Sequence, residues 1–204
     1  MIFEPGYGDQ YNKHPSLLIT KGNGMNNFKL DARQVKAAMV MMAKNDVRYY
    51  LNGLLIGGKK IVATDGHRMI VVDCESADFE PKIFAIKGTL LKSAIECEFV
   101  FIGEDHGIVT TKNSTGTDQD KVVKFAIVEG RYPEWSGVIP NEKPKKVSKA
   151  GFNVGYVADI AKAAELLGSE FQIGEFTFYD RGRVAIDINT PENNAQCVIM
   201  QVRL

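Results

Sequence analysis

The stretch Asn45–Asp73, NDVRYYLNGLLIGGKKIVATDGHRMIVVD, decides the fold that we predict for this chain. Two runs of alternating and β-branched residues, Val47–Ile56 and Lys60–Thr64, flank a Gly-Gly pair, which predicts a β-hairpin. A third run, Met69–Val72, follows an Asp-Gly pair, which is suited to backbone positions with positive φ. The stretch therefore predicts a meander of three strands joined by tight turns.

Composition places the chain among soluble globular proteins. Its 204 residues are 45% hydrophobic and 25% charged, enough for one large or two small domains with a real core. No apolar run approaches the roughly 20 residues that span a bilayer, and the N-terminus MIFEPGYGDQ does not resemble a signal peptide. Cys74, Cys97 and Cys197 are far apart and in apolar surroundings. We expect reduced core cysteines in a cytoplasmic protein.

Charge argues against a tight grip on nucleic acid. The chain has 25 basic and 25 acidic residues, whereas proteins that neutralise many phosphates usually carry a basic excess. Any contact with DNA therefore requires basic residues gathered on one surface, and it should be loose and independent of sequence.

Three helices are predicted from capping residues and apolar spacing. Asp31, with Gln34 three positions later, starts a helix of about three turns. Asn153 caps a helix over Val154–Leu167 that ends at Gly168, and Lys87–Glu96 is predicted as a short helix. The residues expected on the apolar faces are Val35, Ala38, Met39 and Met42 in the helix after Asp31; Leu91, Ala94 and Ile95 in Lys87–Glu96; and Val157, Ile160, Ala161 and Ala164 in Val154–Leu167.

Further strands are predicted at Asn27–Leu30, Ile83–Ile86, Phe99–Ile102, Ile108–Thr111, Val122–Val128, Phe171–Ile173, Phe176–Tyr179, Val184–Ile188 and Cys197–Val202. Three units then share one pattern, a short strand, a helix and three or more strands. We divide the chain into an N-terminal extension (1–26), a complete two-unit domain (27–142), a linker (143–150) and a one-unit half-domain (151–204).

Four motifs occur in one order along the chain: ATDGHR (63–68), EGRYP (129–133), GFNV (151–154) and MQVRL (200–204). In this order and wording the chain resembles the bacterial DNA polymerase III β subunit, the sliding clamp family, as a shortened and phage-borne or chromosomal member. The resemblance implies an α+β DNA-clamp fold of βαβββ units, with helices lining an inner face and sheets outside. A family chain has six units and this one has three, so the ring contact of the family is not available in the same form.

The resemblance also implies a cleft that binds partner peptides of the type Gln-x-x-Leu-Phe, carried by polymerases and clamp loaders. Carried over position by position, the residues expected to line it are Leu51, Thr64, Gly66, His67, Arg68, Met69, Pro140, Asn153, Tyr156, Val198, Met200, Val202, Arg203 and Leu204. Core packing or a surface turn explains each residue taken singly, and only their joint occurrence favours a cleft. Gln201 stands where the family often has Pro.

Double-stranded DNA is the second partner that the resemblance implies. Arg33, Lys36 and Lys44 fall in one row opposite the apolar stripe of the first helix, and Lys92 and Lys162 join them as expected DNA-facing residues. A solvated helix face is the alternative interpretation of that row.

Neither catalysis nor cofactor binding is predicted. The three histidines have no zinc-ligand spacing, and there is no nucleophile elbow, Walker sequence or G-x-G-x-x-G. The leading hypothesis is a non-enzymatic sliding clamp, with a homo-oligomeric ring of four chains because family rings contain twelve units. The alternative is a non-ring module that competes with a full-length clamp for its partners. A sequence-reading DNA regulator is disfavoured because no helix carries a cluster of base-reading side chains.

Overall fold

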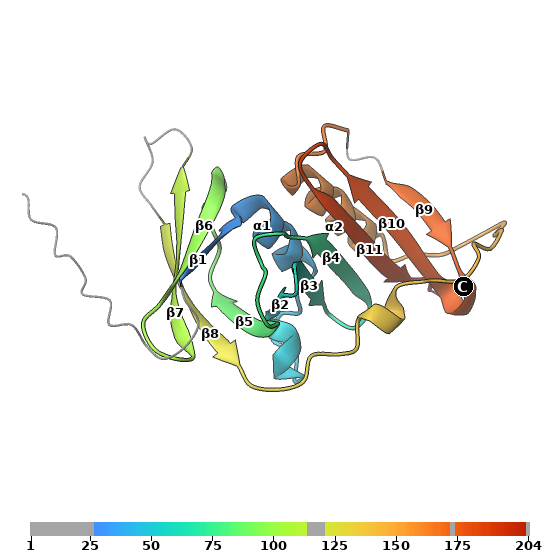
Figure 1. Ribbon diagram of the computed structural model, residues 1–204. Coiled ribbons are helices and arrows are strands. Elements are labelled where there is room, and N and C mark those ends of the chain that lie inside the picture. Colours follow the sequence, from blue (N-terminus) through green and yellow to red (C-terminus); the bar gives the residue numbers. More distant parts are fainter. Residues whose placement is uncertain (1–26, 114–120, 172–173, 203–204) are drawn as a thin grey trace, which may run out of the picture.

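The structure is a computed structural model that describes residues 27–113, 121–171 and 174–202 (Figure 1). The expected N-terminal extension, residues 114–120, most of the strand predicted at Phe171–Ile173, and Arg203 and Leu204 lie outside these residues. The elements are β1 (Phe28–Asp31), α1 (Ala32–Met41), η1 (Tyr49–Asn52), β2 (Leu54–Gly57), β3 (Lys60–Thr64), β4 (Arg68–Asp73), β5 (Lys82–Lys87), β6 (Ala94–Phe101), β7 (His106–Asn113), β8 (Lys121–Val128), η2 (Ser136–Val138), α2 (Val154–Leu166), β9 (Glu175–Phe178), η3 (Asp180–Gly182), β10 (Arg183–Asn189) and β11 (Asn194–Met200).

All eleven strands of the described residues belong to one antiparallel sheet in the order β1-β6-β7-β8-β5-β2-β3-β4-β11-β10-β9. The predicted meander forms as β2-β3-β4, and it is at the centre of this sheet. The first two units exchange their first strands, since β1 pairs with β6 and β5 pairs with β2. The third unit joins through β11, which pairs with β4.

Both helices lie on the same face of the sheet and pack against each other (Figure 1). The Asp31 side chain caps α1 by accepting a hydrogen bond from the Arg33 amide, and Asn153 caps α2 in the same way through the Gly155 amide. Gly168, at φ 94°, follows the end of α2 as predicted. The fold is thus an α+β fold with its helices on one side and its sheet on the other.

Strand alternation produces two cores. The larger lies between the sheet and the helices and contains Ile70 and Val72 of β4. The smaller lies on the opposite face and contains Met69 and Val71 of the same strand, covered by Tyr132 of the connector after β8. Because successive strand residues point to opposite faces, β4 contributes to both cores, and the second core leads to the candidate site.

Residues predicted as the first part of a strand, Val47–Ile56, instead contain a 3-10 turn at η1. The side chain of Asn52 accepts a hydrogen bond from the Asp46 amide at 2.9 Å and donates one to the Asp46 carbonyl at 2.9 Å. The Leu51 amide also bonds to the Arg48 carbonyl at 2.8 Å. These local bonds compete successfully with strand pairing, so the strand begins only at Leu54.

The helix predicted at Lys87–Glu96 does not form, and the described residues of the second unit therefore contain no helix. Gly88 adopts φ 121°, and β6 already begins at Ala94. This strand pairs with β1 on one side and β7 on the other, so two sets of ladder bonds outweigh a short apolar repeat. Ile95, expected inside, is exposed.

Candidate functional site

A cavity of about 350 Å³ opens on the sheet face opposite the helices. It lies where β4 meets β11, and η1 and the connector after β8 form its walls. The lining residues are Arg48, Tyr50, Leu51, Thr64, Gly66, His67, Arg68, Met69, Pro133, Trp135, Val138, Val198 and Met200. Its surface is mostly apolar, with polar groups from the turn between β3 and β4 at its rim.

Eight of the residues expected in a peptide cleft line this cavity. They are Leu51, Thr64, Gly66, His67, Arg68, Met69, Val198 and Met200, which come from parts of the chain far apart in sequence. Four others lie elsewhere, Pro140, Asn153, Tyr156 and Val202. Asn153 is committed to capping α2, and Val202 forms an isolated bridge with Gly151.

The turn between β3 and β4 is held rigidly by its own side chains. Asp65 Oδ1 accepts hydrogen bonds from the amides of His67 at 2.9 Å and Arg68 at 3.0 Å. Thr64 Oγ1 donates to the Arg68 carbonyl at 2.7 Å and accepts from the Gly66 amide at 3.0 Å. Such Asx and Thr bonds fix the backbone without any long-range contact, so the ATDGHR sequence sets one wall of the cavity in advance.

Arg68 connects this turn to the third unit. Its guanidinium pairs with Asp65 at 3.0 Å and with Asp159 of α2, and lies 4.7 Å from the centre of the Tyr156 ring. The His67 ring stacks near Tyr156 with 6.3 Å between centroids. Tyr156 therefore supports the rim of the cavity from outside, which is a positioning role.

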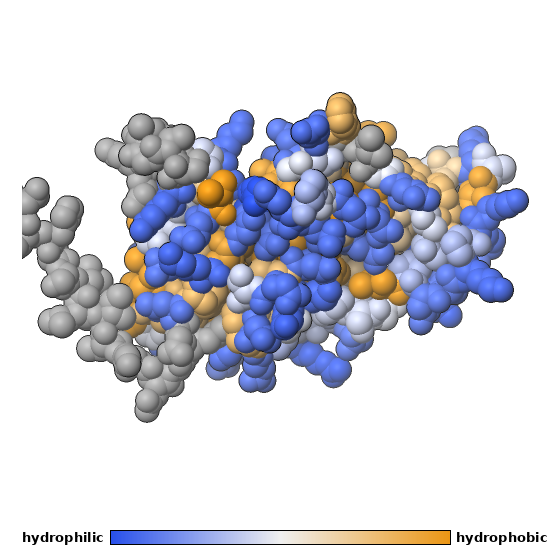
Figure 2. Space-filling view, turned by 45° about the horizontal axis from the view of Figure 1, so that its top comes forward, coloured by the Kyte–Doolittle hydropathy of each residue, from blue (hydrophilic) through white to orange (hydrophobic). Residues whose placement is uncertain are grey.

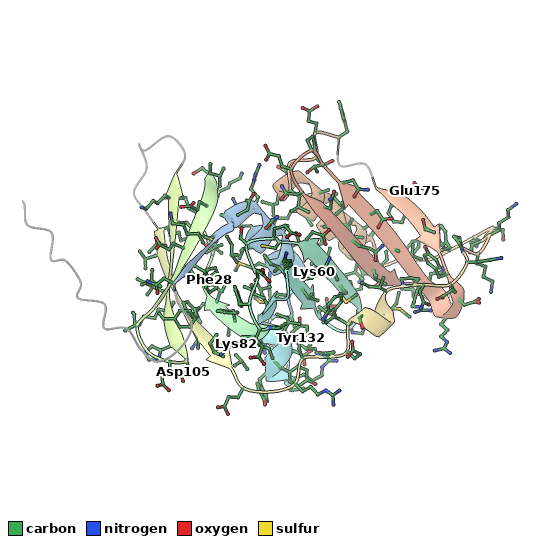
Figure 3. The ribbon with its side chains drawn as sticks, in the orientation of Figure 1. Phe28, Lys60, Lys82, Asp105, Tyr132 and Glu175 are labelled. Carbon is green, nitrogen blue, oxygen red and sulfur yellow. The ribbon has the colours of Figure 1, made fainter. Side chains whose placement is uncertain are left out.

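Sequence reasoning missed the contribution of the connector, Pro133, Trp135 and Val138. Tyr132 anchors this segment: it is buried in the smaller core, and its hydroxyl donates a hydrogen bond to the Val62 carbonyl at 3.5 Å (Figure 3). Burial raises the pKa of Tyr132, so the phenol stays neutral. The signal that could have predicted this wall of the cavity is the presence of two aromatic residues, Tyr132 and Trp135, in a connector that has no strand or helix periodicity. Arg48 and Tyr50 were missed because their segment was predicted as a strand.

Two of the basic residues expected to face DNA are committed to contacts within the chain. Arg33 pairs with Asp31 at 2.6 Å and Glu192 at 2.5 Å, which raises its pKa further. Lys36 Nζ donates to the carbonyls of Lys92 at 2.7 Å and Ala94 at 2.8 Å. Partial burial lowers the pKa of Lys36.

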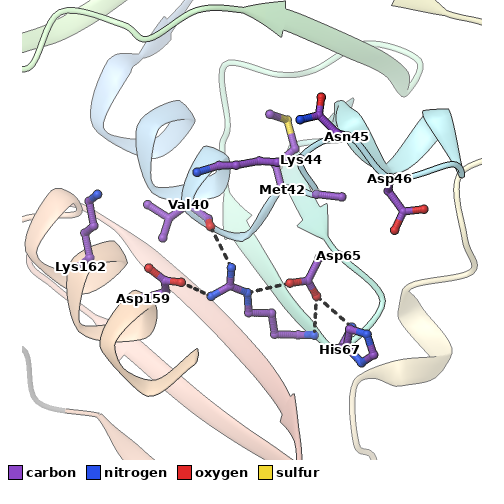
Figure 4. A pocket seen from close by; sticks show the side chains of 11 residues that line it. Val40, Met42, Lys44, Asn45, Asp46, Asp65, His67, Asp159 and Lys162 are labelled. Carbon is purple, nitrogen blue, oxygen red and sulfur yellow. Dashed lines mark hydrogen bonds and ion pairs between the residues drawn. The ribbon is translucent and has the colours of Figure 1, made fainter. Parts of the chain in front are cut away.

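The remaining expected residues are exposed, but they do not form a helical row. Lys44 follows the end of α1, Lys162 lies on α2, and Lys92 lies in the loop before β6. Lys44 and Lys162 line a cavity of about 460 Å³ between the C-terminal end of α1 and the middle of α2, together with Asp46 and Asp159 (Figure 4). Charges of both signs therefore face this space.

No group of three His, Cys, Asp or Glu side chains in the described part of the chain could hold a metal ion. Among these residues, no helix has the combined length and apolar character that crossing a membrane requires.

Comparison with known proteins bears directly on this architecture. No protein-family model matches the chain. The chain is 30% identical over 177 residues to the beta sliding clamp of Escherichia coli strain K12, covering 83% of this chain and 47% of that protein. It is 28% identical over 194 residues to the beta sliding clamp of Pseudomonas aeruginosa, covering 85% of this chain and 49% of the relative.

Solved structures give the same answer for the fold. The match to the DNA polymerase III subunit beta of Borrelia burgdorferi covers 95% of this chain and 67% of that protein's chain, with a TM-score of 0.59 and 14% identity. The match to the DNA polymerase sliding clamp of P. aeruginosa covers 96% of this chain and 70% of that protein's chain, with a TM-score of 0.54 and 19% identity. The fold is that of the DNA sliding clamps.

By its sequence, the chain belongs to the bacterial beta sliding clamp family. It spans about half the length of the curated relatives that it matches.

Proposed function

We propose that this chain acts as a reduced, non-enzymatic sliding clamp, which encircles duplex DNA and holds a replicative polymerase through a peptide bound in the β4–β11 cavity. The observation that carries the proposal is the convergence of eight separated residues of the expected cleft on one apolar cavity. Apolar clefts with a few fixed polar groups at the rim are typical sites for short linear peptides.

The chemistry of the cavity suits the leucine and phenylalanine of a Gln-x-x-Leu-Phe peptide. Leu51, Met69 and Val198 are buried side chains that offer an apolar floor, and Met200 is 41% exposed at the opening. Methionine side chains repack easily around different partners. The polar edge of the turn Thr64–Arg68 is available to orient the glutamine.

Integrity of the cavity depends on the docking of the third unit. Val198 and Met200 belong to β11, whereas Met69 belongs to β4, and Val198 is paired directly with Met69. The proposed site is therefore a property of the assembled chain, and neither the two-unit part nor the half-domain would contain it alone.

For DNA we propose weak, non-specific contact along the helix-bearing face. Lys44, Lys92 and Lys162 remain available there, while Arg33 and Lys36 act mainly within the fold. With equal numbers of basic and acidic residues, few phosphate contacts form, which allows sliding. Three units per chain then call for four chains in a ring.

The second candidate function is a non-ring module that competes with a full-length clamp for partner peptides. It is favoured by one observation, that the cavity forms within a single chain whereas two of the five expected DNA-facing residues are internally paired. Native mass separates the two functions, because the competitor needs no oligomer.

Peptide binding is the direct test. In a fluorescence-anisotropy titration, we expect a labelled Gln-x-x-Leu-Phe peptide to bind with a Kd on the order of 1–10 μM, or about −7 to −8 kcal/mol. Met200→Asp should weaken binding more than roughly tenfold, because the peptide would desolvate a carboxylate without a partner. A matched control is Ile102→Asp, which places the same charge at an exposed apolar residue outside the cavity.

Absence of wild-type binding at several hundred micromolar peptide would reject the site. Equal losses in both aspartate variants would instead indicate a general effect of added charge, and would also count against it.

A further inference from the structure

The third unit exposes apolar positions that the first domain keeps buried. Val154, the first residue of α2, is 82% exposed, whereas Ala32, the first residue of α1, is 0% exposed. Phe176 in the β9–β10 hairpin and Phe99 in the β6–β7 hairpin occupy equivalent positions, because each lies two residues before the last paired residue of its first strand. Phe176 is 37% exposed and Phe99 is 0% exposed. At the right-hand end of Figure 2, where the third unit lies, hydrophobic side chains reach the surface.

Strand β9 is the last strand of the sheet (Figure 1). At its C-terminal end the Phe178 carbonyl points away from β10 and accepts a hydrogen bond from the Lys145 amide of the same chain at 2.7 Å, so this group is not available to a partner. Backbone direction alternates along a strand, so the N–H and C=O of Phe176 point outward as well. An edge of this kind can accept another strand.

The first domain shows how this family of units fills such an edge. Its two units exchange their first strands: β1 of the first unit pairs with β6, and β5 of the second unit pairs with β2. Each exchanged strand covers the edge that corresponds to β9 in the third unit. Among the residues that the structure describes, the third unit has no second unit beside it with which to make this exchange.

We propose that two copies of this chain make the exchange with each other about a twofold axis. Residues 149–151 of one copy pair with residues 175–177 of its partner's β9, and the two half-domains together form one complete clamp domain. This inference deepens the assembly proposed above and rests on it, but it does not depend on peptide binding.

The donor segment is already positioned for this role. Gly151 bridges to Val202, just beyond the end of β11 in the same unit. In the same way β5 pairs with β8 of its own unit along one side, while its other side pairs with β2. The second side of residues 149–151 is therefore the one expected to meet the partner.

Charge complementarity supports the same pairing. In the first domain Phe28 lies opposite Phe99, and Lys29 pairs with Glu96 at 2.9 Å, two residues along from its direct neighbour Glu98. Phe28 and Ala150 each precede a helix cap by three residues, so this register places Ala150 opposite the partner's Phe176.

The same register places Lys149 opposite the partner's Thr177 and diagonal to the partner's Glu175. Glu175 lies on the outermost strand (Figure 3), where a lysine can reach it. The twofold axis forms this ion pair twice.

Each dimer would contain three complete domains in an arc, and two such arcs match the four-chain ring. The twofold interface would then form two of the four contacts between chains in the ring.

Charge reversal tests the interface in the full chain. By light scattering at tens of micromolar, we expect the wild-type mass to be that of two chains or four. Lys149→Glu and Glu175→Lys should each weaken dimerisation roughly tenfold, halving the mass as the protein is diluted, and the double variant should restore it. Lys143→Glu, in the same basic segment but outside the pairing, should leave the mass unchanged.

A covalent test fixes the register. On the outer side of β9, Thr177 occupies a position whose cross-strand neighbour is not hydrogen-bonded to it, where the short separation suits a disulfide. Lys149→Cys with Thr177→Cys should give a covalent dimer under mild oxidation, whereas either single variant should not. A double variant that stays monomeric on a non-reducing gel overturns the pairing.

Peptide anisotropy on the same variants separates this inference from the proposed function, because the cavity lies within one chain. A monomeric wild type that binds peptide overturns the twofold interface and the ring but leaves the peptide site standing, whereas an oligomer that binds peptide and is insensitive to both charge reversals overturns the twofold interface alone. A dimer sensitive to both charge reversals that binds no peptide supports the interface and rejects the cleft.

Discussion

Arg68 is the residue through which the candidate site and the assembly of the units depend on each other. Its side chain is only 11% exposed, and its charge is met by Asp65 in the same turn and Asp159 on α2. It also donates a hydrogen bond to the Val40 carbonyl, in the last turn of α1, at 3.4 Å. One guanidinium therefore joins the turn, α1 and α2.

We predict that Arg68→Met lowers the free energy of unfolding by about 2–4 kcal/mol, because it leaves Asp159 partly buried without its partner. Urea denaturation followed by circular dichroism measures the loss. Lys29→Met removes an ion pair in which both side chains are about half exposed, and it should leave the midpoint unchanged. A similar midpoint for both variants would show that the Arg68 network does not stabilise the fold.

The three cysteines illustrate burial without reactivity. All are free and buried, and burial raises the pKa of the Cys74 thiol to about 11 and those of Cys97 and Cys197 to about 12. A raised thiol pKa keeps the neutral form dominant up to that pH, and the neutral thiol is not the nucleophile.

We therefore predict no reaction of the native protein with a thiol reagent at pH 8 within minutes, and reaction of all three cysteines after denaturation. Absorbance of the released thiolate counts them. Rapid labelling of the native chain would mean that a cysteine is more exposed than the structure has it.

At the scale of the element, the hairpin between β2 and β3 shows how closely a turn can be specified. Gly58 and Lys59 both have positive φ, at 57° and 61°, between the paired residues Gly57 and Lys60, which defines a type I′ turn. Gly57 has φ 139°, and a Cβ added there would lie 2.5 Å from the Cα of Pro81. The first glycine is therefore required by a close approach as well as by its conformation.

Gly57→Ala should destabilise the protein by about 2–4 kcal/mol through strain and a backbone clash. Thermal unfolding measures it. Gly137→Ala is the matched control, since a Cβ there meets nothing within 4 Å. If Gly57→Ala unfolds at the wild-type temperature, the hairpin can relax around the added methyl group.

At the scale of the whole molecule, the two faces of the sheet separate two proposed tasks. The helices cover one face, where Lys44 and Lys162 lie, and the β4–β11 cavity opens on the other. A ring that holds DNA inside and partners outside needs this separation, because a polymerase must reach the cavity while DNA occupies the centre.

We predict weak binding of linear duplex DNA that falls with rising salt and shows no sequence preference. Lys44→Glu with Lys162→Glu should reduce it severalfold in an electrophoretic or anisotropy assay. Lys87→Glu with Lys124→Glu is the control, since these paired residues project from the strands opposite to the core side occupied by Ile86 and Phe125. A tight footprint on one sequence would contradict the prediction and favour a regulator.

The sequence by itself determined the local features. The caps of α1 and α2 and the Gly-Gly and Asp-Gly turns depend on contacts within a few residues, so residue type and spacing suffice to predict them. The same holds for the rim of the cavity, where ATDGHR closes its own hydrogen bonds. The resemblance to the clamp family predicted the other four cavity residues, Leu51, Met69, Val198 and Met200.

Only the tertiary structure decided the features whose partners are far apart in the chain. Residues 94–96, at the end of the predicted helix, became part of β6 because β1 and β7 were available to pair with this strand. Arg33 and Lys36, which have the spacing of a solvated face, were drawn into internal contacts by Glu192 and by the carbonyls of Lys92 and Ala94. Trp135 joined the cavity because Tyr132 anchors its connector beneath the sheet. In each case the deciding free energy comes from a partner that local sequence does not specify.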